Sequence, residues 1–245
     1  MTKVTLITGG SRGIGAATAR LSAAEGHAVA INYRSDATAA EKVRAEVESV
    51  GAKAMVVQAD TGVESDIMHM FEEVDRNLGT VTGLVNNAGI HGPRGRLDAL
   101  SAGDIDRVLE VNVRGYFLCA REAIKRMSTK HGGAGGSIVN VSSGSARLGN
   151  PNDGVLYAAS KGAVNSLTIG LSQEVAGEGI RINTVAPGLT ATDMPPPDKL
   201  ETQGPGIPIG RVAEASEIAE AIVWLLSDKA SYTAGANIRV GGGRI

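Results

Sequence analysis

Short, almost continuously apolar runs alternate along the chain with longer segments whose apolar residues recur at helical spacing. The short runs are rich in β-branched residues, which is typical of strands buried on both faces. They lie at residues 3–8, 28–32, 54–59, 83–87, 137–142, 181–186 and 237–240. The longer segments predict helices at residues 16–25, 39–50, 64–78, 104–127, 155–175 and 214–226. This alternation predicts an α/β fold in which right-handed crossovers place helices on both faces of a parallel sheet, a doubly wound three-layer sandwich.

One proline-rich stretch interrupts this pattern. Residues 187–211 hold six of the eight prolines, so they are expected to form neither a long helix nor a central strand. The stretch leaves the carboxyl end of a predicted strand, which is the edge where open α/β sheets bind ligands. We therefore expect residues 189–211 to form a lid over a substrate pocket.

Length and composition narrow the possible functions. A chain of 245 residues with 42% hydrophobic content suits one core, so residues 1–245 are expected to form a single domain. A net charge of -2 and only 3% aromatic residues argue against nucleic-acid binding. The apolar run near the N-terminus is too short for a membrane span or a signal segment, so we expect a cytoplasmic protein. The single Cys119 and four scattered histidines do not predict a metal site.

A glycine-rich turn, "TGGSRGIG" at residues 8–15, follows the first predicted strand and opens a helix. Glycine lets the backbone approach a diphosphate closely, and the helix N-terminus offers free N–H groups and a partial positive charge. A glycine pattern alone is a weak signal, but its place after the first strand of a βαβ unit favours a dinucleotide site. The residues of this turn expected to bind the cofactor are Gly9, Ser11, Arg12, Gly13, Ile14 and Gly15.

The end of the second predicted strand indicates which cofactor binds. A site that prefers NAD places an acidic residue there to bind the ribose hydroxyls, but this chain has Tyr33 followed by Arg34. Arg12 is a second guanidinium in the glycine turn, and the planar fork of arginine suits phosphate oxygens. We therefore expect NADP rather than NAD. Asp36 is expected to cap the helix that begins at Ala37.

A tyrosine and a lysine four residues apart, in "YAASK" at residues 157–161, predict the catalytic chemistry. On a helix, Tyr157 and Lys161 share one face, and a nearby cation favours the phenolate. Hydride transfer to a carbonyl leaves an alkoxide, which needs a proton donor and a second hydrogen-bond donor. Tyr157 is the expected acid, and Ser142 or Ser143, at the end of the fifth predicted strand, is the expected second donor. Each piece alone also fits an ordinary surface helix or turn, so the inference depends on their conjunction.

The order of these motifs resembles that of the short-chain dehydrogenase/reductase family of the compact cytosolic type. The resemblance covers nearly the whole chain through "TGGSRGIG", "NNAG" (86–89), "VNVRG" (111–115), "VNVSS" (139–143), "YAASK", "NTVAPG" (183–188) and the C-terminal residues 227–243. It implies a Rossmann-type sheet of seven strands in the order 3-2-1-4-5-6-7, a nicotinamide cofactor and a homotetramer. The substrate would be a small carbonyl compound or alcohol.

The resemblance also assigns roles to individual residues. Tyr157 would be the acid and base, Lys161 would also bind the nicotinamide ribose, and Ser143 would orient the substrate. Asn112 would distort its helix and hold a water that links Lys161 to solvent. The remaining cofactor contacts implied by the resemblance are Asp60 and Thr61 at the adenine, Asn87, Ala88 and Gly89 beneath the adenosine ribose, and Pro187, Gly188, Thr190 and Thr192 at the carboxamide.

Two features leave alternatives open. The interval from Ser143 to Tyr157 is one residue longer than the family's commonest spacing, so Ser142 and Ser145 remain alternatives for the catalytic serine. The predicted helix 104–127 has apolar residues on more than one face, which agrees with a partner subunit but also with a fit within one chain.

Several functions are compatible with these motifs. A 3-oxoacyl thioester reductase would use Arg94, Arg96, Arg121 and Arg126 to bind an acidic carrier protein. A sugar or polyol dehydrogenase is the other substrate class, since "INYRSD" is similar to the strand end of bacterial glucose 1-dehydrogenases. A sugar-nucleotide epimerase or dehydratase could share the tyrosine and lysine, but such enzymes generally need a larger C-terminal substrate domain. Only 34 residues follow Arg211, which disfavours this function. A non-catalytic NADP(H) sensor would be expected to lose Tyr157 or Lys161. This chain keeps both residues, which disfavours the sensor.

Overall fold

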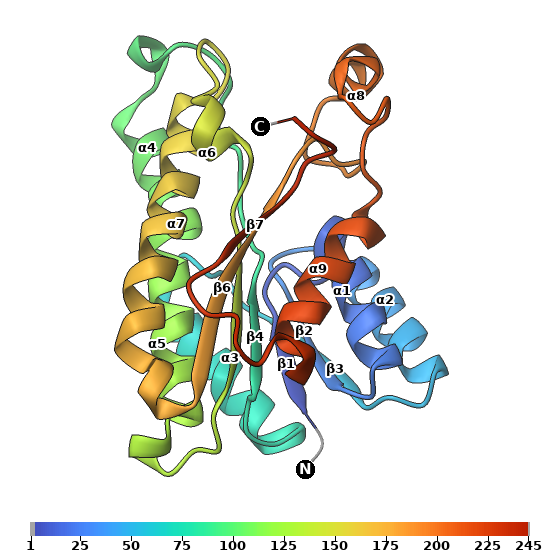
Figure 1. The fold of residues 1–245 in the computed structure, drawn as a ribbon, viewed down its shortest axis with the longest axis vertical. Helices are drawn as coiled ribbons and strands as arrows, with labels where there is room; N and C mark the ends of the chain where they lie inside the picture. Colours follow the sequence, from blue (N-terminus) through green and yellow to red (C-terminus); the bar gives the residue numbers. More distant parts are fainter. Residues whose placement is uncertain (1–2, 245) are drawn as a thin grey trace.

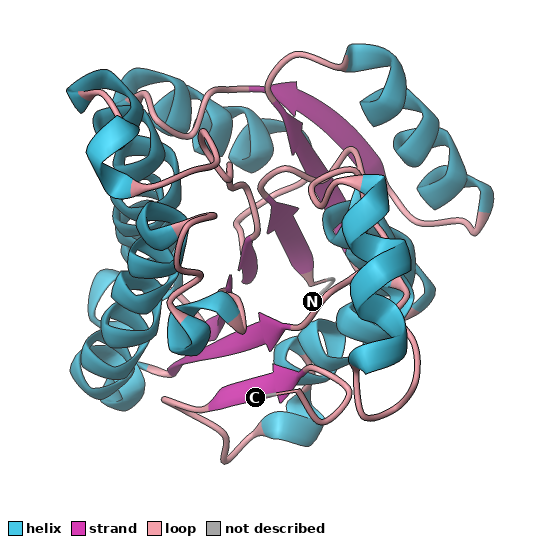
Figure 2. Ribbon diagram, turned by 90° about the horizontal axis from the view of Figure 1, so that it is seen from above, coloured by secondary structure: helices cyan, strands magenta, loops and turns pink. Residues whose placement is uncertain are grey.

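The computed structural model describes residues 3–244 and shows one sheet between two layers of helices (Figures 1 and 2). All seven strands pair in parallel in the order β3-β2-β1-β4-β5-β6-β7, which confirms the predicted fold class. The strands are β1 (Val4–Ile7), β2 (Ala28–Tyr33), β3 (Ala54–Gln58), β4 (Gly83–Asn86), β5 (Gly136–Val141), β6 (Ile180–Pro187) and β7 (Asn237–Val240).

The α-helices are α1 (Gly13–Ala24), α2 (Ala37–Ser49), α3 (Glu64–Asn77), α4 (Ala102–Leu109), α5 (Gly115–Met127), α6 (Ser145–Leu148), α7 (Val155–Val175), α8 (Pro197–Gln203) and α9 (Ala215–Leu226). The predicted helices are present within a few residues of their expected positions, and two short helices, α6 and α8, were not predicted. Asp36 caps α2 as predicted, because its carboxylate accepts a hydrogen bond of 3.0 Å from the Ala39 N–H.

The helix predicted over residues 104–127 is present, but it is not a regular α-helix throughout. Two α-helices, α4 and α5, occupy this stretch, and a π-helical turn at Glu110–Arg114 separates them. The chain is closely packed where this turn ends: a Cβ at Gly115 would lie 2.4 Å from the Thr61 carbonyl oxygen, so the chain passes very close to the loop after β3. Such π turns within helices often mark functional sites.

Alternating side chains of the strands build a core on each face of the sheet. Leu6 belongs to the cluster under α3, α5 and α7, whereas its neighbour Ile7 belongs to the cluster under α1, α2 and α9. In Figure 1, α5 and α7 stand on one side of the strands, and α1, α2 and α9 stand on the other. Because every strand runs in the same direction, all the turns after the strands meet at one edge.

The proline-rich stretch after β6 forms no long helix or central strand, as predicted. It contains the seven-residue helix α8, which starts with Pro197 at a position where a missing N–H is tolerated. Thr190 makes a single parallel bridge with Ala213, so the two ends of the stretch lie together. Within residues 3–244, no helix combines the length and apolarity that a membrane crossing requires.

Candidate active site

A large cavity of about 860 Å³ opens at the edge of the sheet where the strands end. Its volume lies within the range of small-molecule and cofactor sites. The turns after β1, β2, β4, β5 and β6 all contribute to its wall. The predicted site residues that line it are Gly9, Ser11, Arg12, Gly13, Ile14, Tyr33, Arg34, Asp60, Thr61, Asn87, Ala88, Gly89, Ser143, Tyr157, Lys161, Pro187, Gly188, Thr190 and Thr192.

Gly15 and Asn112 lie behind this wall and support it. A Cβ at Gly15 would lie 2.3 Å from the Gly9 carbonyl oxygen, so glycine is required for the glycine turn to close on α1. Asn112 is fully buried, and its amide accepts a bond of 2.8 Å from the Ile90 N–H and donates one of 2.8 Å to the Ile90 carbonyl. The side chain of Asn112 therefore fixes the loop that follows β4.

The glycine turn forms a shallow cradle that fits the diphosphate of a dinucleotide. Gly9 and Gly13 have φ angles of 62° and 51°, a region that favours glycine. A Cβ at Gly13 would lie 3.0 Å from the Thr192 methyl group, so a larger residue would fill the cradle. The first turn of α1 begins here, with the N–H groups and the partial positive charge that bind anions.

Two guanidinium groups lie at the end of the cavity formed by the turns after β1 and β2. Arg34 follows β2 and has an exposed side chain, and Arg12 belongs to the glycine turn. Arg12 lies 3.2 Å from the Asp193 carboxylate, an exposed ion pair that joins the glycine turn to the segment after β6. Asp36 is occupied by capping α2, so this end of the cavity is suited to bind a phosphate group.

Asp60 lies in the same wall with both carboxylate oxygens engaged. One accepts a bond of 2.8 Å from the Gly62 N–H, and the other a bond of 2.6 Å from the Arg107 guanidinium. Burial raises the pKa of Asp60, but the bonds from Gly62 and Arg107 outweigh it and lower the pKa overall. Arg107, which the sequence reasoning missed, also lines the cavity.

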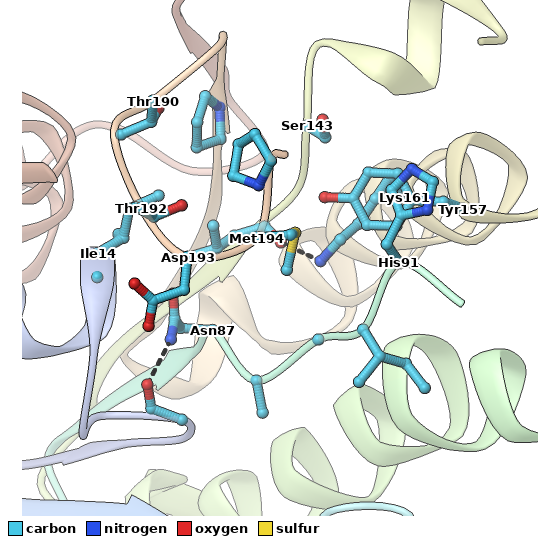
Figure 3. A pocket seen from close by; sticks show the side chains of 18 of the residues that line it. Ile14, Asn87, His91, Ser143, Tyr157, Lys161, Thr190, Thr192, Asp193 and Met194 are labelled. Atoms are coloured by element: carbon cyan, nitrogen blue, oxygen red, sulfur yellow. Dashed lines mark hydrogen bonds between the residues drawn. The ribbon is translucent and has the colours of Figure 1, made fainter. Parts of the chain in front are cut away.

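Tyr157 and Lys161 lie one turn apart on α7 and both line the cavity (Figure 3). Their exposed fractions are only 8% and 2%. The Lys161 ammonium donates a bond of 2.8 Å to the Val141 carbonyl and one of 3.0 Å to the Tyr116 hydroxyl. It lies 5.9 Å from the centre of the Tyr157 ring, so the shared helix face expected from the sequence is present.

Burial dominates the ionisation of both groups. It lowers the pKa of Lys161 from 10.5 to about 7, and it raises the pKa of Tyr157 despite a smaller opposing effect of the Ser143 hydroxyl. The sequence led us to expect a lowered pKa for Tyr157. The direction differs because the Lys161 ammonium bonds to Val141 and Tyr116, while the phenolate form of Tyr157 loses hydration. Tyr157 is therefore protonated at neutral pH.

The hydrogen bonds of the three candidate serines distinguish between them. The hydroxyl of the buried Ser142 donates to the Lys161 carbonyl at 3.0 Å, and the Ser145 hydroxyl accepts a bond of 2.9 Å from the Asn150 amide. The Ser143 oxygen accepts a bond of 3.1 Å from the Ser145 N–H. Of the three hydroxyl groups, that of Ser143 is the one that affects the pKa of Tyr157, which it lowers.

The loop between Ser143 and Tyr157 contains two left-handed asparagines. Asn150 and Asn152 have φ angles of 44° and 61°, a conformation that asparagine adopts more readily than most residues. The next residue, Asp153, bonds to Arg94 at 2.6 Å and to Lys199 of α8 at 2.8 Å. These ion pairs join the loop after β4, the loop before α7 and the proline-rich segment.

His91 lines the cavity from the loop after β4, and the sequence analysis did not identify it as a functional residue. Its ring stacks on the Tyr157 ring, with the centroids 5.0 Å apart and the planes at 20° (Figure 3). The available signal was its position, because it follows "NNAG" at the carboxyl end of a predicted strand. Within the described residues, no group of three or more His, Cys, Asp or Glu side chains is placed to hold a metal ion.

Sequence and structure comparisons agree with the motifs and the sheet order. Residues 9–244 match the family described as Enoyl-(Acyl carrier protein) reductase. The chain is 50% identical over 245 residues to the uncharacterized oxidoreductase YgfF of Escherichia coli (strain K12), covering 98% of this chain and 99% of the relative. It is 37% identical over 246 residues to the 3-oxoacyl-(acyl-carrier-protein) reductase FabG of Staphylococcus aureus, covering 99% of this chain and 98% of that one.

A solved structure extends this similarity to three dimensions. The crystal structure of a short chain dehydrogenase from Burkholderia cenocepacia J2315 in complex with NADP matches with a TM-score of 0.91 and 37% identity, covering 99% of this chain and 97% of that chain. The chain therefore belongs to the short-chain dehydrogenase/reductase family, as the motifs indicated. It shares with its relatives the broad activity class of oxidoreductases.

Proposed function

We propose that this protein catalyses the reversible, NADP(H)-dependent reduction of a ketone to a secondary alcohol, with Tyr157 as the acid and base. The observation that carries the proposal is the convergence of Ser143, Tyr157 and Lys161 in the cavity that also contains the glycine cradle. The raised pKa of Tyr157 supports its role as proton donor in the reductive direction, because burial keeps the phenol protonated.

The chain's own groups act on the carbonyl oxygen and on the proton. Bound NADPH would supply the hydride. Ser143 and Tyr157 donate hydrogen bonds to the carbonyl oxygen, and Tyr157 transfers its proton to that oxygen as negative charge develops. The Lys161 ammonium, close to the Tyr157 ring, stabilises the phenolate that remains. In the oxidative direction the phenolate form of the same tyrosine would accept the hydroxyl proton.

The preference for NADP(H) depends on Arg12 and Arg34, and the NADP complex of the Burkholderia relative supports it. The change Arg34→Glu is expected to weaken NADPH binding about ten- to hundredfold, because a charge-assisted bond to the 2′-phosphate is replaced by repulsion. NADH binding should change less than threefold. Fluorescence titration of both cofactors tests this, with Arg76→Gln on the outside of α3 as the control. An equal loss for NADH and NADPH would contradict the assignment.

We also propose that residues 189–211 form the lid of this site. Lys199 and Asp193 connect the segment to Asp153 and Arg12 on opposite parts of the cavity wall. Met194 and Pro195 line the cavity from the same segment. NADPH with a bound product is expected to protect this segment from limited proteolysis. Cleavage at the same rate with and without ligands would show that it is an ordinary loop.

A homotetramer is the assembly that we propose. Phe117 on α5 is 51% exposed and Leu109 on α4 is 39% exposed, which leaves apolar side chains on the outer face of this helix pair. Helix pairing between copies would cover them. Light scattering is expected to give the mass of four chains, and Phe117→Asp is expected to yield smaller species. A monomeric wild type would contradict the proposal.

The substrate class is tested by a panel of 3-oxoacyl thioesters, diketones, ketosteroids and keto-sugars. NADPH oxidation in the presence of one class of compound would identify the substrate class. Tight NADPH binding without turnover of any compound would favour a sensor.

The four arginines considered as a carrier-protein surface each pair with a carboxylate of this chain: Arg94 with Asp153, Arg96 with Asp98, Arg121 with Glu64 and Arg126 with Asp75. This pairing weakens the case for a carrier-protein partner.

A further inference from the structure

His91 contacts the proposed acid directly. Its imidazole lies almost parallel to the Tyr157 ring at 5.0 Å, and it reaches this position from the loop after β4, opposite α7. Aromatic pairs at this distance stabilise one another beyond the area they bury. The stack covers one face of the phenol, so it affects both the direction of the hydroxyl group and its contact with water.

Three further contacts fix the position of the imidazole or of the backbone that carries it. A Cβ at Gly154 would lie 2.7 Å from both Cε1 and Nε2 of His91, so only glycine leaves room for the ring at this point. The residue before it, Ile90, is bound through its N–H and its carbonyl to the buried Asn112 amide. The Nδ1 atom of His91 lies 3.3 Å from the Gly92 carbonyl oxygen.

The charges around His91 favour its neutral form. Arg94 and Lys199 both act on its charge and both pair with Asp153. Tyr157 stacks on the ring, and the Lys161 ammonium lies 5.9 Å from the centre of the Tyr157 ring. Burial and then Arg94 lower the pKa of His91, and together they outweigh the Gly92 carbonyl and Asp153. The ring that stacks on Tyr157 at neutral pH is therefore a flat, uncharged one.

We propose that His91 is a positioning residue for the proposed reaction: its ring, stacked between Gly154 and Tyr157, sets the plane of the phenol and shields it from water. This proposal rests on the proposed function for its catalytic consequence. The contact itself depends only on the fold. A flat ring is the property that matters, so phenylalanine should replace histidine and alanine should not.

The kinetic test compares His91→Phe and His91→Ala with the wild type, and His131→Ala, an exposed histidine between α5 and β5, is the control. His91→Ala is expected to lower kcat at least tenfold, because small misplacements of a catalytic group are costly, while the Kd for NADPH changes less than twofold. His91→Phe is expected to retain kcat within threefold. Unchanged kcat in His91→Ala, or equal losses in both variants, would overturn the proposal.

A second readout requires no turnover. The ultraviolet titration of tyrosinate in the wild type, minus that of Tyr157→Phe, reports the ionisation of Tyr157. His91→Ala is expected to shift this ionisation to lower pH, because water reaches the phenol, and His91→Phe to leave it in place. The shift without turnover of any carbonyl compound would support the positioning role and contradict the proposed function. Turnover that requires Tyr157, with no shift and no loss in His91→Ala, would contradict only the role of His91.

Discussion

Replacement of Tyr157 by phenylalanine is expected to lower kcat for carbonyl reduction by about 10²- to 10⁴-fold, the usual contribution of a positioned acid or base. Phenylalanine fills the same buried space and can stack on His91, so the fold and the Kd for NADPH should be preserved. Stopped-flow measurement of NADPH oxidation, with fluorescence titration of the cofactor, separates the two effects.

The matched control for this prediction is Tyr232→Phe, which removes the hydroxyl of an exposed tyrosine before β7. It should behave as the wild type in both measurements. If Tyr157→Phe kept its kcat within threefold, the proton would have to come from another group and the proposed role of Tyr157 would be wrong.

Replacement of Lys161 by methionine is expected to lower kcat by about 10²- to 10³-fold, since a cation that stabilises developing charge is lost. Because the same ammonium is expected to bind the cofactor ribose, the Kd for NADPH should also rise. Methionine is close to lysine in length and suits a buried position, so the fold should persist. Near-normal kcat in Lys161→Met would contradict the role of the cation.

The same variant is expected to change how stability depends on pH. Burial lowers the pKa of Lys161 to about 7 in the folded protein, against 10.5 as its ordinary value. Between these values the unfolded chain binds more protons, so the free energy of unfolding of the wild type rises with pH. Chemical denaturation at pH 7 and pH 9 should show this rise in the wild type and a smaller one in Lys161→Met. Equal pH dependence would mean that Lys161 is charged when folded at pH 9.

The sheet could be predicted because each strand carries its own signal. Buried parallel strands are continuously apolar, and the order of strands and helices then leaves few possible topologies. The π-helical turn within residues 104–127 could not be predicted from periodicity, although the family resemblance implied that Asn112 distorts this helix. The turn coincides with contacts outside the helix: Asn112 binds the loop after β4, and Gly115 approaches Thr61. Helical periodicity within a segment does not report such contacts.

The site could be predicted as far as it depends on motifs at the ends of strands. Gly9, Tyr157 and Lys161 line one cavity. They lie together because all the strands are parallel, so the segments that follow the strands begin at the same edge of the sheet. The stack of His91 on Tyr157 and the bond from Arg107 to Asp60 depend on distances between segments, which the sequence pattern does not contain. The lowered pKa of Lys161 likewise follows from depth of burial.

Transfer of isotope from labelled NADPH tests the central claim most directly. The protein is incubated with the carbonyl panel and with either (4R)- or (4S)-deuterated NADPH. The products are analysed by mass spectrometry. We predict that one of the two labels places a single deuterium on the carbinol carbon of a product, and that Tyr157→Phe forms this product at least a hundredfold more slowly. NADPH oxidation that leaves no deuterium in any product, or equal transfer by Tyr157→Phe, would contradict the account.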